Sequence, residues 1–284
     1  MKIAKHWLKE NGFTRCLLCP HECLIIEGNT GLCRARKNIS GELFSLSYGK
    51  LACINLDPIE KKPLRHFYPG TKIMSFGSFG CNFRCSFCQN WQISQCDEST
   101  MPLQELSAEE ASKLALTQNS IGAAYTYNEP LINFEWVLET SQKVKSKNGK
   151  NVLVTNAYAN PQPLDDLLGF IDAANIDVKA FTESFYRKYC GGSLIKVIKA
   201  VEKFVQKSVH IEITTLLIPG ENDSVEEISK LVDWLAGINA EIPLHFSKYF
   251  PSYKLELEPT PMDILQRAAD IASKKLKYVY LGNV

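Results

Sequence analysis

The chain has 284 residues, of which 45% are apolar and 22% charged. These values are ordinary for a folded globular protein, and the length allows one large domain or two smaller ones. The formal net charge of +1 gives no sequence-wide attraction to nucleic acid or to an anionic membrane, and no segment approaches the ~18 consecutive apolar residues of a membrane span. Residues 1–13 carry charges where a signal peptide has an unbroken apolar run. We therefore expect a cytoplasmic protein that binds neither nucleic acid nor membrane.

The ten cysteines are the main chemical signal in the composition. They are too few per residue for a secreted disulfide framework, and clustered cysteines in a reducing compartment indicate metal binding or catalysis. Four of them fall within residues 16–33 and three within residues 81–88. We therefore expect two cysteine sites.

The first cysteine set lies in residues 1–70, which we interpret as a cysteine-rich N-terminal module. Four thiolates on segments rich in turn residues suit zinc or a closed iron-sulfur cluster, and spacing alone does not choose between them. We favour iron-sulfur, which can relay electrons, whereas zinc would only hold the module together. Free or incidentally paired thiols remain the alternative. The four residues are Cys16, Cys19, Cys23 and Cys33.

A basic cluster ends this module, just before the first strand of the larger domain at residues 71–284. It consists of Lys61, Lys62, Arg65 and His66. These side chains either hold a substrate carboxylate near the mouth of the fold or form a solvated basic turn.

From residue 72 onward, short β-branched runs alternate with helical patterns, which is typical of β/α units around a parallel sheet. Ser107 with Glu110 and Ser224 with Glu227 are predicted capping boxes at helix starts. Right-handed crossovers make such units roll into a barrel or an open doubly wound sheet. We expect an α/β fold, a partial TIM barrel of about six β/α units. The predicted strands are 72–79, 121–127, 151–156, 175–179, 209–217, 242–247 and 277–281.

The second cysteine set, in FGSFGCNFRCSFCQNW after the first of these strands, gives Cys81, Cys85 and Cys88. Three thiolates on one loop can ligate three irons of a four-iron cluster and leave the fourth iron open to a small molecule. A zinc loop with Cys96 as the fourth ligand is the alternative.

This spacing, with aromatic Phe87 before the last cysteine, resembles the signature of the radical S-adenosylmethionine (SAM) superfamily. The resemblance implies a [4Fe-4S] cluster whose open iron binds S-adenosylmethionine. One electron then cleaves the cofactor to methionine and a 5'-deoxyadenosyl radical, which abstracts hydrogen from a substrate. An external one-electron reductant of the flavodoxin or ferredoxin type is implied as well.

The end of the second strand reads Tyr127-Asn128-Glu129-Pro130, where the superfamily has Gly-Gly-Glu-Pro. Glu129 and Pro130 are retained and the two glycines are absent. The resemblance implies that this segment, with Asn128 and Glu129, binds the amino group of the cofactor. The alternative is a plain turn and helix start, since proline is common in a first helical turn.

Later strand ends add polar side chains. The third strand ends at Asn156, and alternation on the fourth strand places Asp177 and Lys179 on one face. Because unpaired buried charge is costly, this pair either binds a zwitterion such as the methionyl part of the cofactor or is a structural ion pair. Asp-x-Lys resembles the pattern of glycyl-radical activating enzymes. His245 on the sixth strand either positions substrate or cofactor as a catalytic residue or is a structural hydrogen-bonded histidine.

The N-terminal cysteines, the segment 57–70 and the late PLHFSKYFP segment make nearly the whole chain look like the radical SAM enzymes of the AmmeMemoRadiSam system, a branch similar to the pyruvate formate-lyase activating enzyme. That resemblance leads us to expect that the relatives run past the residues equivalent to 281–284 into a short tail with further cysteines, whereas this chain stops at Val284. The substrate is either a protein glycine, as for an activase, or a small metabolite or amino acid. An iron-sulfur electron carrier and a zinc protein that binds nucleic acid are the competing classes.

Overall fold

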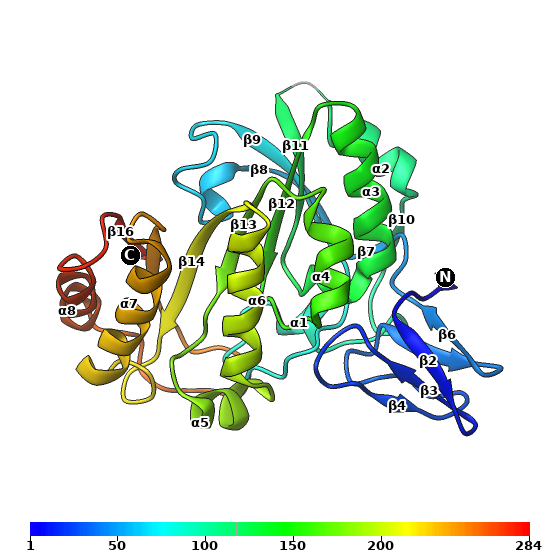
Figure 1. Ribbon diagram of the computed structural model, residues 1–284, viewed down its shortest axis with the longest axis horizontal. Coiled ribbons are helices and arrows are strands. Elements are labelled where there is room, and N and C mark those ends of the chain that lie inside the picture. The colour runs from blue at the N-terminus through cyan, green and yellow to red at the C-terminus, as the bar shows by residue number, and fades with distance from the viewer. Residues whose placement is uncertain (118) are drawn as a thin grey trace.

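An open sheet of eight strands organises the computed structural model, which describes residues 1–117 and 119–284 (Figure 1). Neighbouring strands from β9 to β16 are parallel, and β8 pairs antiparallel with β9 at one edge. The seven predicted strands are confirmed to within a few residues, whereas β8 was not predicted. In spatial order the strands are β16 (Val279–Gly282), β15 (Leu244–Lys248), β14 (His210–Leu217), β13 (Ala173–Asp177), β12 (Lys150–Thr155), β11 (Ser120–Tyr125), β9 (Lys72–Gly77) and β8 (Cys53–Pro58).

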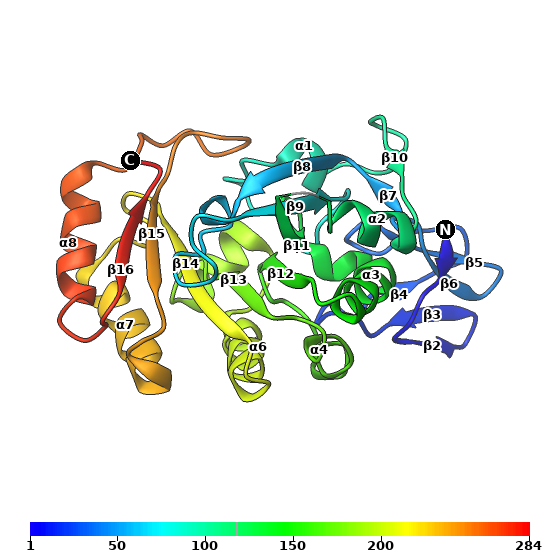
Figure 2. The same cartoon turned by 90° about the horizontal axis from the view of Figure 1, so that it is seen from above.

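Helices cover one face of this sheet. Figure 2 shows α3, α4, α6 and α7 on the outer side of the curved sheet, with α8 beside β15 and β16. The helices are α1 (Trp91–Ser94), α2 (Ala108–Leu114), α3 (Phe134–Ser146), α4 (Pro161–Leu168), α5 (Glu183–Phe185), α6 (Leu194–Gln206), α7 (Val225–Asn239) and α8 (Met262–Ala272), with 3-10 turns η1 (Ile59–Lys61) and η2 (Pro130–Asn133) and a π-helical turn η3 (Tyr186–Cys190).

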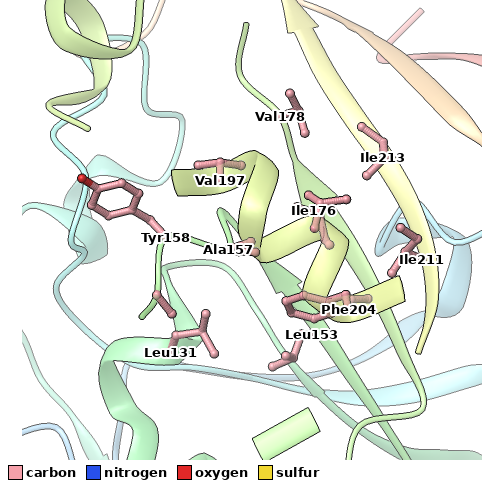
Figure 3. Packing of buried hydrophobic residues seen from close by; sticks show 14 of the residues in the cluster. Leu131, Leu153, Ala157, Tyr158, Ile176, Val178, Val197, Phe204, Ile211 and Ile213 are labelled. Atoms are coloured by element: carbon pink, nitrogen blue, oxygen red, sulfur yellow. The ribbon is translucent and has the colours of Figure 1, made fainter. Parts of the chain in front are cut away.

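The main core lies between the sheet and these helices (Figure 3). Val197 and Phe204 of α6 are fully buried against the outward side chains of the strands, among them Ile176 and Ile213. Val178 is buried with them. Strand alternation therefore directs Asp177 and Lys179 to the opposite, inner face.

The two predicted caps differ in detail. Ser107 and Glu110 form the reciprocal capping box at the start of α2. At α7, Ser224 accepts from the Glu227 N–H, but the Glu227 carboxylate accepts from the Phe181 N–H at 2.6 Å instead of completing the box. Val225, the first residue of α7, is exposed.

A loop covers the inner face at the amino ends of the strands. Leu64 and Phe67 belong to this loop, residues 59–70, and pack with residues of β9, β11, β12 and β13 in a second apolar cluster. The Pro63 carbonyl accepts from Asn175. In the predicted basic cluster, Lys62 is buried and bonds Asp57 at 2.7 Å. Lys61, Arg65 and His66 are exposed, so one member of the cluster is packed into the fold and three face solvent, and a substrate carboxylate site there stays a prediction.

Small antiparallel sheets make up the first part of the chain. One has the order β1-β6-β5, a second β2-β3-β4, and β10 pairs with β7. These strands are β1 (Lys2–Ile3), β2 (Trp7–Glu10), β3 (Phe13–Cys16), β4 (Leu24–Ile25), β5 (Arg36–Ile39), β6 (Glu42–Ser45), β7 (Lys50–Leu51) and β10 (Gln104–Glu105). Since β8 already joins the large sheet, a domain boundary at residue 70 stays a prediction. No helix in the described residues combines the length and apolarity needed to cross a bilayer.

Candidate active site

The three clustered cysteines lie on the loop of residues 78–90, which we call the cysteine loop, directly after β9. Gly80 in this loop has a φ of +79°, and a Cβ there would lie 2.2 Å from the carbonyl oxygen of Cys33. A left-handed φ and so close an approach can be met only by glycine. The loop therefore packs directly on the first cysteine segment.

Distant parts of the chain hold the cysteine loop. Arg84 and Ser86 donate their N–H groups to the Cys190 and Tyr189 carbonyls at 2.7 and 3.1 Å. These carbonyls belong to η3, and π-helical turns are frequent at functional sites. On the other side, Lys254 donates its N–H to the Ser86 carbonyl at 2.8 Å. The loop is thus fixed by backbone bonds on both sides.

Burial dominates the electrostatics of the three thiols. Burial, then the Glu129 carboxylate, raises the pKa of Cys81 well above its usual range, and burial does the same to a smaller extent for Cys88. The pKa of Cys85 is raised first by a hydrogen bond with the Cys190 thiol and then by burial. The Lys179 ammonium opposes these effects at Cys85 and Cys88 by lowering their pKa values. A bound cation would be needed to hold all three as thiolates at neutral pH.

Residues 1–117 and 119–284 contain no group of three or more His, Cys, Asp or Glu side chains placed to hold a single metal ion. In a four-iron cluster each thiolate binds a different iron, so the ligands need not converge on one point. The donor set of the cysteine loop, three soft sulfur ligands with a cation nearby, fits such a cluster.

The end of β11 reaches the cysteine loop through Asn128. Its Oδ1 accepts from the Ser78 N–H at 3.1 Å, and its Nδ2 donates to the Gly80 carbonyl at 2.9 Å. Asn128 therefore fixes the approach of the chain to Cys81.

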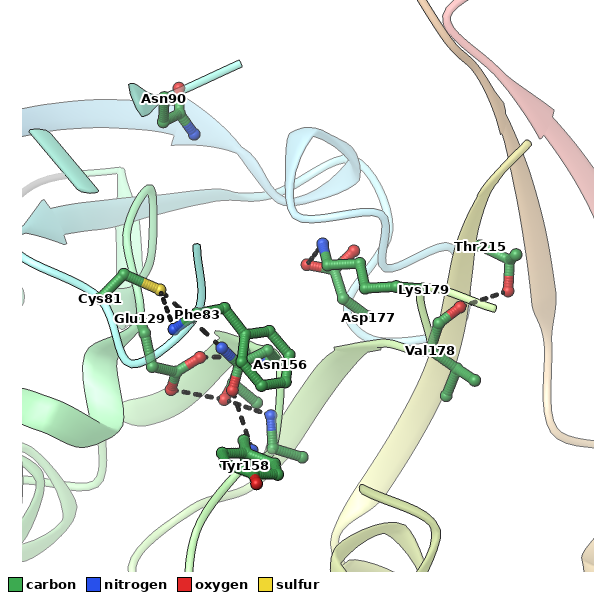
Figure 4. Close-up of polar contacts among 12 residues, drawn as sticks. Cys81, Phe83, Asn90, Glu129, Asn156, Tyr158, Asp177, Val178, Lys179 and Thr215 are labelled. Carbon is green, nitrogen blue, oxygen red and sulfur yellow. Dashed lines mark hydrogen bonds and ion pairs between the residues drawn. The ribbon is translucent and has the colours of Figure 1, made fainter. Parts of the chain in front are cut away.

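Glu129 is buried and faces the end of β12 (Figure 4). Its carboxylate accepts from Thr155 Oγ1 at 2.7 Å, the Leu131 N–H at 3.0 Å and the Asn156 N–H at 2.8 Å. Burial raises the pKa of Glu129 to about 7, while these donors act in the opposite direction. The carboxylate is thus a preorganised acceptor close to Cys81.

Asn156 connects the end of β12 to the cysteine loop. Its Nδ2 lies 2.9 Å from Asn82 Oδ1 and 3.9 Å from the Cys81 sulfur, and its Oδ1 accepts from the Tyr158 N–H. Asn82 in turn donates to the Tyr158 carbonyl at 2.8 Å. These amides fix the rim of the loop nearest β12.

Asp177 and Lys179 form an ion pair at 2.8 Å at the carboxyl end of β13. Burial disfavours the Lys179 charge, but Asp177 and then Cys85 more than offset it, so the pKa of Lys179 is raised. The Lys179 N–H also donates to the Tyr186 hydroxyl of η3. Figure 4 shows the pair beside the Cys81, Glu129 and Asn156 group.

Phe87 and His245 are placed differently from each other. Phe87, within the cysteine loop, is buried, and its ring centroid lies 5.8 Å from that of Phe185. His245 shares a row of the sheet with Asp177, two strands away, but its ring bonds Glu212 at 2.6 Å. The structure therefore groups His245 with the loop of residues 59–70, and its catalytic role stays a prediction.

The four N-terminal cysteines line a single cavity, together with His21 and Arg36. Burial raises the pKa of Cys33 to about 11 and raises that of Cys19 further above its usual value. The structure thus brings the members of this predicted set together. By contrast, the Cys96 thiol donates to the Ile93 carbonyl at 3.1 Å and contacts the Met101 sulfur, in a separate apolar cluster.

Sequence reasoning missed three residues of the site. Asn82 hydrogen-bonds Asn156 just beyond the end of β12, the Cys190 thiol raises the pKa of Cys85, and the Tyr186 hydroxyl accepts from the Lys179 N–H. Of these three, Asn82 could have been found from the sequence, because it lies next to Cys81 inside the cysteine motif. The other two come from η3, which forms contacts with the loop only in the folded chain.

The chain is similar to several known proteins. A family model described as the radical SAM superfamily matches residues 76–235. An uncharacterized protein of Methanocaldococcus jannaschii is 40% identical over 273 residues, covering 95% of this chain and 81% of that protein. The pyruvate formate-lyase-activating enzyme of Staphylococcus epidermidis is 22% identical over 186 residues, covering 60% of this chain and 71% of that protein. The solved structure of Streptococcus suis SuiB bound to S-adenosylmethionine has a TM-score of 0.57 at 15% identity, over 72% of this chain and 48% of that one, which indicates a shared fold.

Proposed function

The chain belongs to the radical SAM superfamily of enzymes, and from that premise we propose that Cys81, Cys85 and Cys88 hold a [4Fe-4S] cluster whose open iron binds S-adenosylmethionine. When bound, the cluster supplies one electron that cleaves the cofactor to methionine and a 5'-deoxyadenosyl radical, which abstracts hydrogen from the substrate. In this proposal the open parallel sheet and its helices form the partial barrel of about six β/α units. Residues 1–70 are the cysteine-rich module and residues 71–284 are the radical SAM domain.

The observation that carries the proposal is the convergence of charged groups on the cysteine loop. Glu129 acts electrostatically on Cys81, and Lys179 on Cys85 and Cys88. In a parallel sheet the carboxyl ends of the strands meet at one edge, where ligands bind. A carboxylate, an ammonium and three thiols at that edge suit a zwitterionic cofactor.

Each residue around the loop has a proposed task. Glu129 accepts from the amino group of the cofactor, while Asp177 and Lys179 complement its methionyl charges. Asn128 and Asn156 fix the loop and the strand end against which the cofactor lies. Further contacts are proposed for the buried ring of Phe87 with the cofactor and for His245 with the substrate.

The substrate is proposed to be a protein glycine, as the likeness to the Staphylococcus activating enzyme suggests, with a small metabolite or amino acid as the second candidate. In either case the reaction takes its electron from an external reductant of the flavodoxin or ferredoxin type. A cytoplasmic location is proposed because such reductants and free thiolates require a reducing compartment.

We also propose that Cys16, Cys19, Cys23 and Cys33 bind a metal, since they line one cavity. As residue types, four soft sulfur ligands accept either an iron-sulfur cluster or zinc.

The test is anaerobic reconstitution of the full chain with iron and sulfide, followed by reduction with dithionite in the presence of S-adenosylmethionine. We expect 5'-deoxyadenosine, its loss in Cys85→Ser, and its retention in the matched control Cys53→Ser. A protein loaded with four-iron clusters that forms no 5'-deoxyadenosine would refute the radical enzyme and leave the electron carrier as the competing class, and residual product in Cys85→Ser would refute the assignment of Cys85 as a ligand.

A further inference from the structure

We propose that the four N-terminal cysteines hold a second iron-sulfur cluster that passes electrons from the external reductant to the cluster on the cysteine loop. The inference rests on the proposed radical chemistry, because a relay has a purpose only where a buried cluster consumes electrons. It adds to that proposal the kind of metal centre at the N-terminal cysteines and the route by which electrons reach the cysteine loop.

The site is built from an apolar cavity with four thiols in its wall. Apolar side chains of Leu18, Ile25, Leu32 and Ile132 complete much of the lining. The cysteines come from the end of β3, the loop that leads to β4, and the segment before β5. Since free thiols gain nothing from such convergence, a soft metal centre is the chemistry that the lining suits.

A buried cation faces the same cavity. Arg36 is 1% exposed, lines the cavity and forms an ion pair with Glu135 at 2.5 Å. Its Nε has no hydrogen-bond partner within the described part of the chain. Because a buried donor without a partner is costly, an anionic group in the cavity would account for it. Four thiolates around a metal provide that negative charge.

The wall of the cavity is shared with the cysteine loop. Asn82 lines the cavity, and its carbonyl bonds His21 Nε2 at 2.8 Å. The Arg84 guanidinium donates to the Leu32 carbonyl, and Gly80 packs on the Cys33 carbonyl. The residue next to Cys81 therefore separates the two sets of sulfur ligands, so that an electron has one layer of protein to cross.

Iron-sulfur is favoured over zinc on two grounds. Zinc has no redox chemistry and cannot relay an electron. In a cluster each thiolate binds a different iron, so four thiols spread around the wall of one cavity suit the several irons of a cluster. In the relay the donor loses one electron and is oxidised; this electron reduces the N-terminal cluster and then passes to the cluster on the cysteine loop, and no bond or proton changes hands.

The metal is tested in a chain that lacks the other site, Cys81→Ala/Cys85→Ala/Cys88→Ala, reconstituted anaerobically with iron, sulfide and zinc. We expect about four irons and about four sulfides per chain and an electron paramagnetic resonance signal after reduction. One zinc per chain, or no bound metal, would overturn the inference.

The relay is tested with Cys19→Ser/Cys33→Ser and the control Cys53→Ser. Formation of 5'-deoxyadenosine is driven either by reduced flavodoxin or by dithionite, a small reductant that does not need a protein docking site. We expect the ratio of flavodoxin-driven to dithionite-driven turnover to fall in the double variant and to stay unchanged in the control. An unchanged ratio, or loss of all iron from the double variant, would assign the site a structural role and refute the relay.

The two proposals fail separately. Unmodified protein that holds about eight irons but cleaves no S-adenosylmethionine would refute the radical chemistry and keep the second cluster. Protein that cleaves the cofactor with about four irons and one zinc would refute only the second cluster.

Discussion

Replacing Glu212 with glutamine tests how the inner face of the sheet is closed at its amino end. The buried carboxylate accepts from four donors: the rings of His245 and His210 and the N–H groups of Arg65 and His66. It therefore fastens the loop of residues 59–70 to β14 and holds His245 in place. Glutamine keeps the shape but loses the charge and one acceptor oxygen.

The magnitude follows from the carboxyl group itself. Its hydrogen bonds outweigh the effect of burial and lower the pKa of Glu212 from 4.5 to about 2, which corresponds to about 3 kcal/mol of stability at neutral pH. Because the pKa is lowered on folding, this contribution is complete above about pH 4.5 and disappears as the pH falls toward 2. Glu212→Gln is thus expected to cost about 3 kcal/mol at pH 7.

The assay is urea unfolding of the metal-free full chain under reducing conditions, followed by circular dichroism at pH 7 and at several values between pH 4.5 and 3. The difference between the original protein and Glu212→Gln should shrink across that acid range. Glu226→Gln, at an exposed position where the carboxylate pairs with Lys230, serves as control and should leave the midpoint unchanged. Equal pH dependence of the original protein and Glu212→Gln would refute the reasoning.

Three further changes probe the site. Gly80→Ala should lower both the unfolding midpoint and the iron bound per chain. Its control Gly28→Ala has the same φ but no atom within 4 Å of the new Cβ, so it should show only the cost of about 1 kcal/mol for a left-handed residue. Equal effects of the two substitutions would contradict the clash with Cys33. Arg36→Met should lower the free energy of unfolding in urea by about 3–5 kcal/mol because it leaves the buried Glu135 charge without its partner. Arg36→Met/Glu135→Leu should recover most of that free energy. A double variant no more stable than the single one would argue against the ion pair. Lys179→Met should weaken S-adenosylmethionine binding in equilibrium dialysis about 10–100-fold, as for a lost charge-assisted hydrogen bond, with unchanged iron content; unaltered affinity would make Lys179 structural.

The parallel strands could be predicted because each is a short apolar run followed by helix signals, so periodicity alone identifies it. Strand β8 could not, since its pairing partner β9 lies beyond a loop and antiparallel edge pairing leaves little pattern in CINLDP. Contacts between distant elements also explain why the capping box at α7 was predicted but is incomplete. The Glu227 carboxylate accepts from the Phe181 N–H instead of the cap residue, and a local motif does not encode such a contact.

For the site, local spacing identified the cysteine loop, and alternation placed Asp177 and Lys179 together as the structure has them. Sequence could not tell that the His245 ring would turn to Glu212, because that bond depends on the register between β14 and β15. Nor could it show Cys190 beside Cys85, since the π-helical turn that carries Cys190 has no composition of its own.

The bonds that hold the cysteine loop also set an order of events during synthesis. All seven clustered cysteines have been synthesised once residue 88 is made, yet the carbonyls that accept from Arg84 and Ser86 come from residues 190 and 189, and the N–H that completes the loop comes from Lys254. The nascent chain therefore carries exposed thiols for most of its translation before the loop can take its final shape. If the cysteine loop holds the proposed cluster, metal loading there would be a late step of biogenesis, and fragments that end before residue 190 should bind iron poorly at this loop.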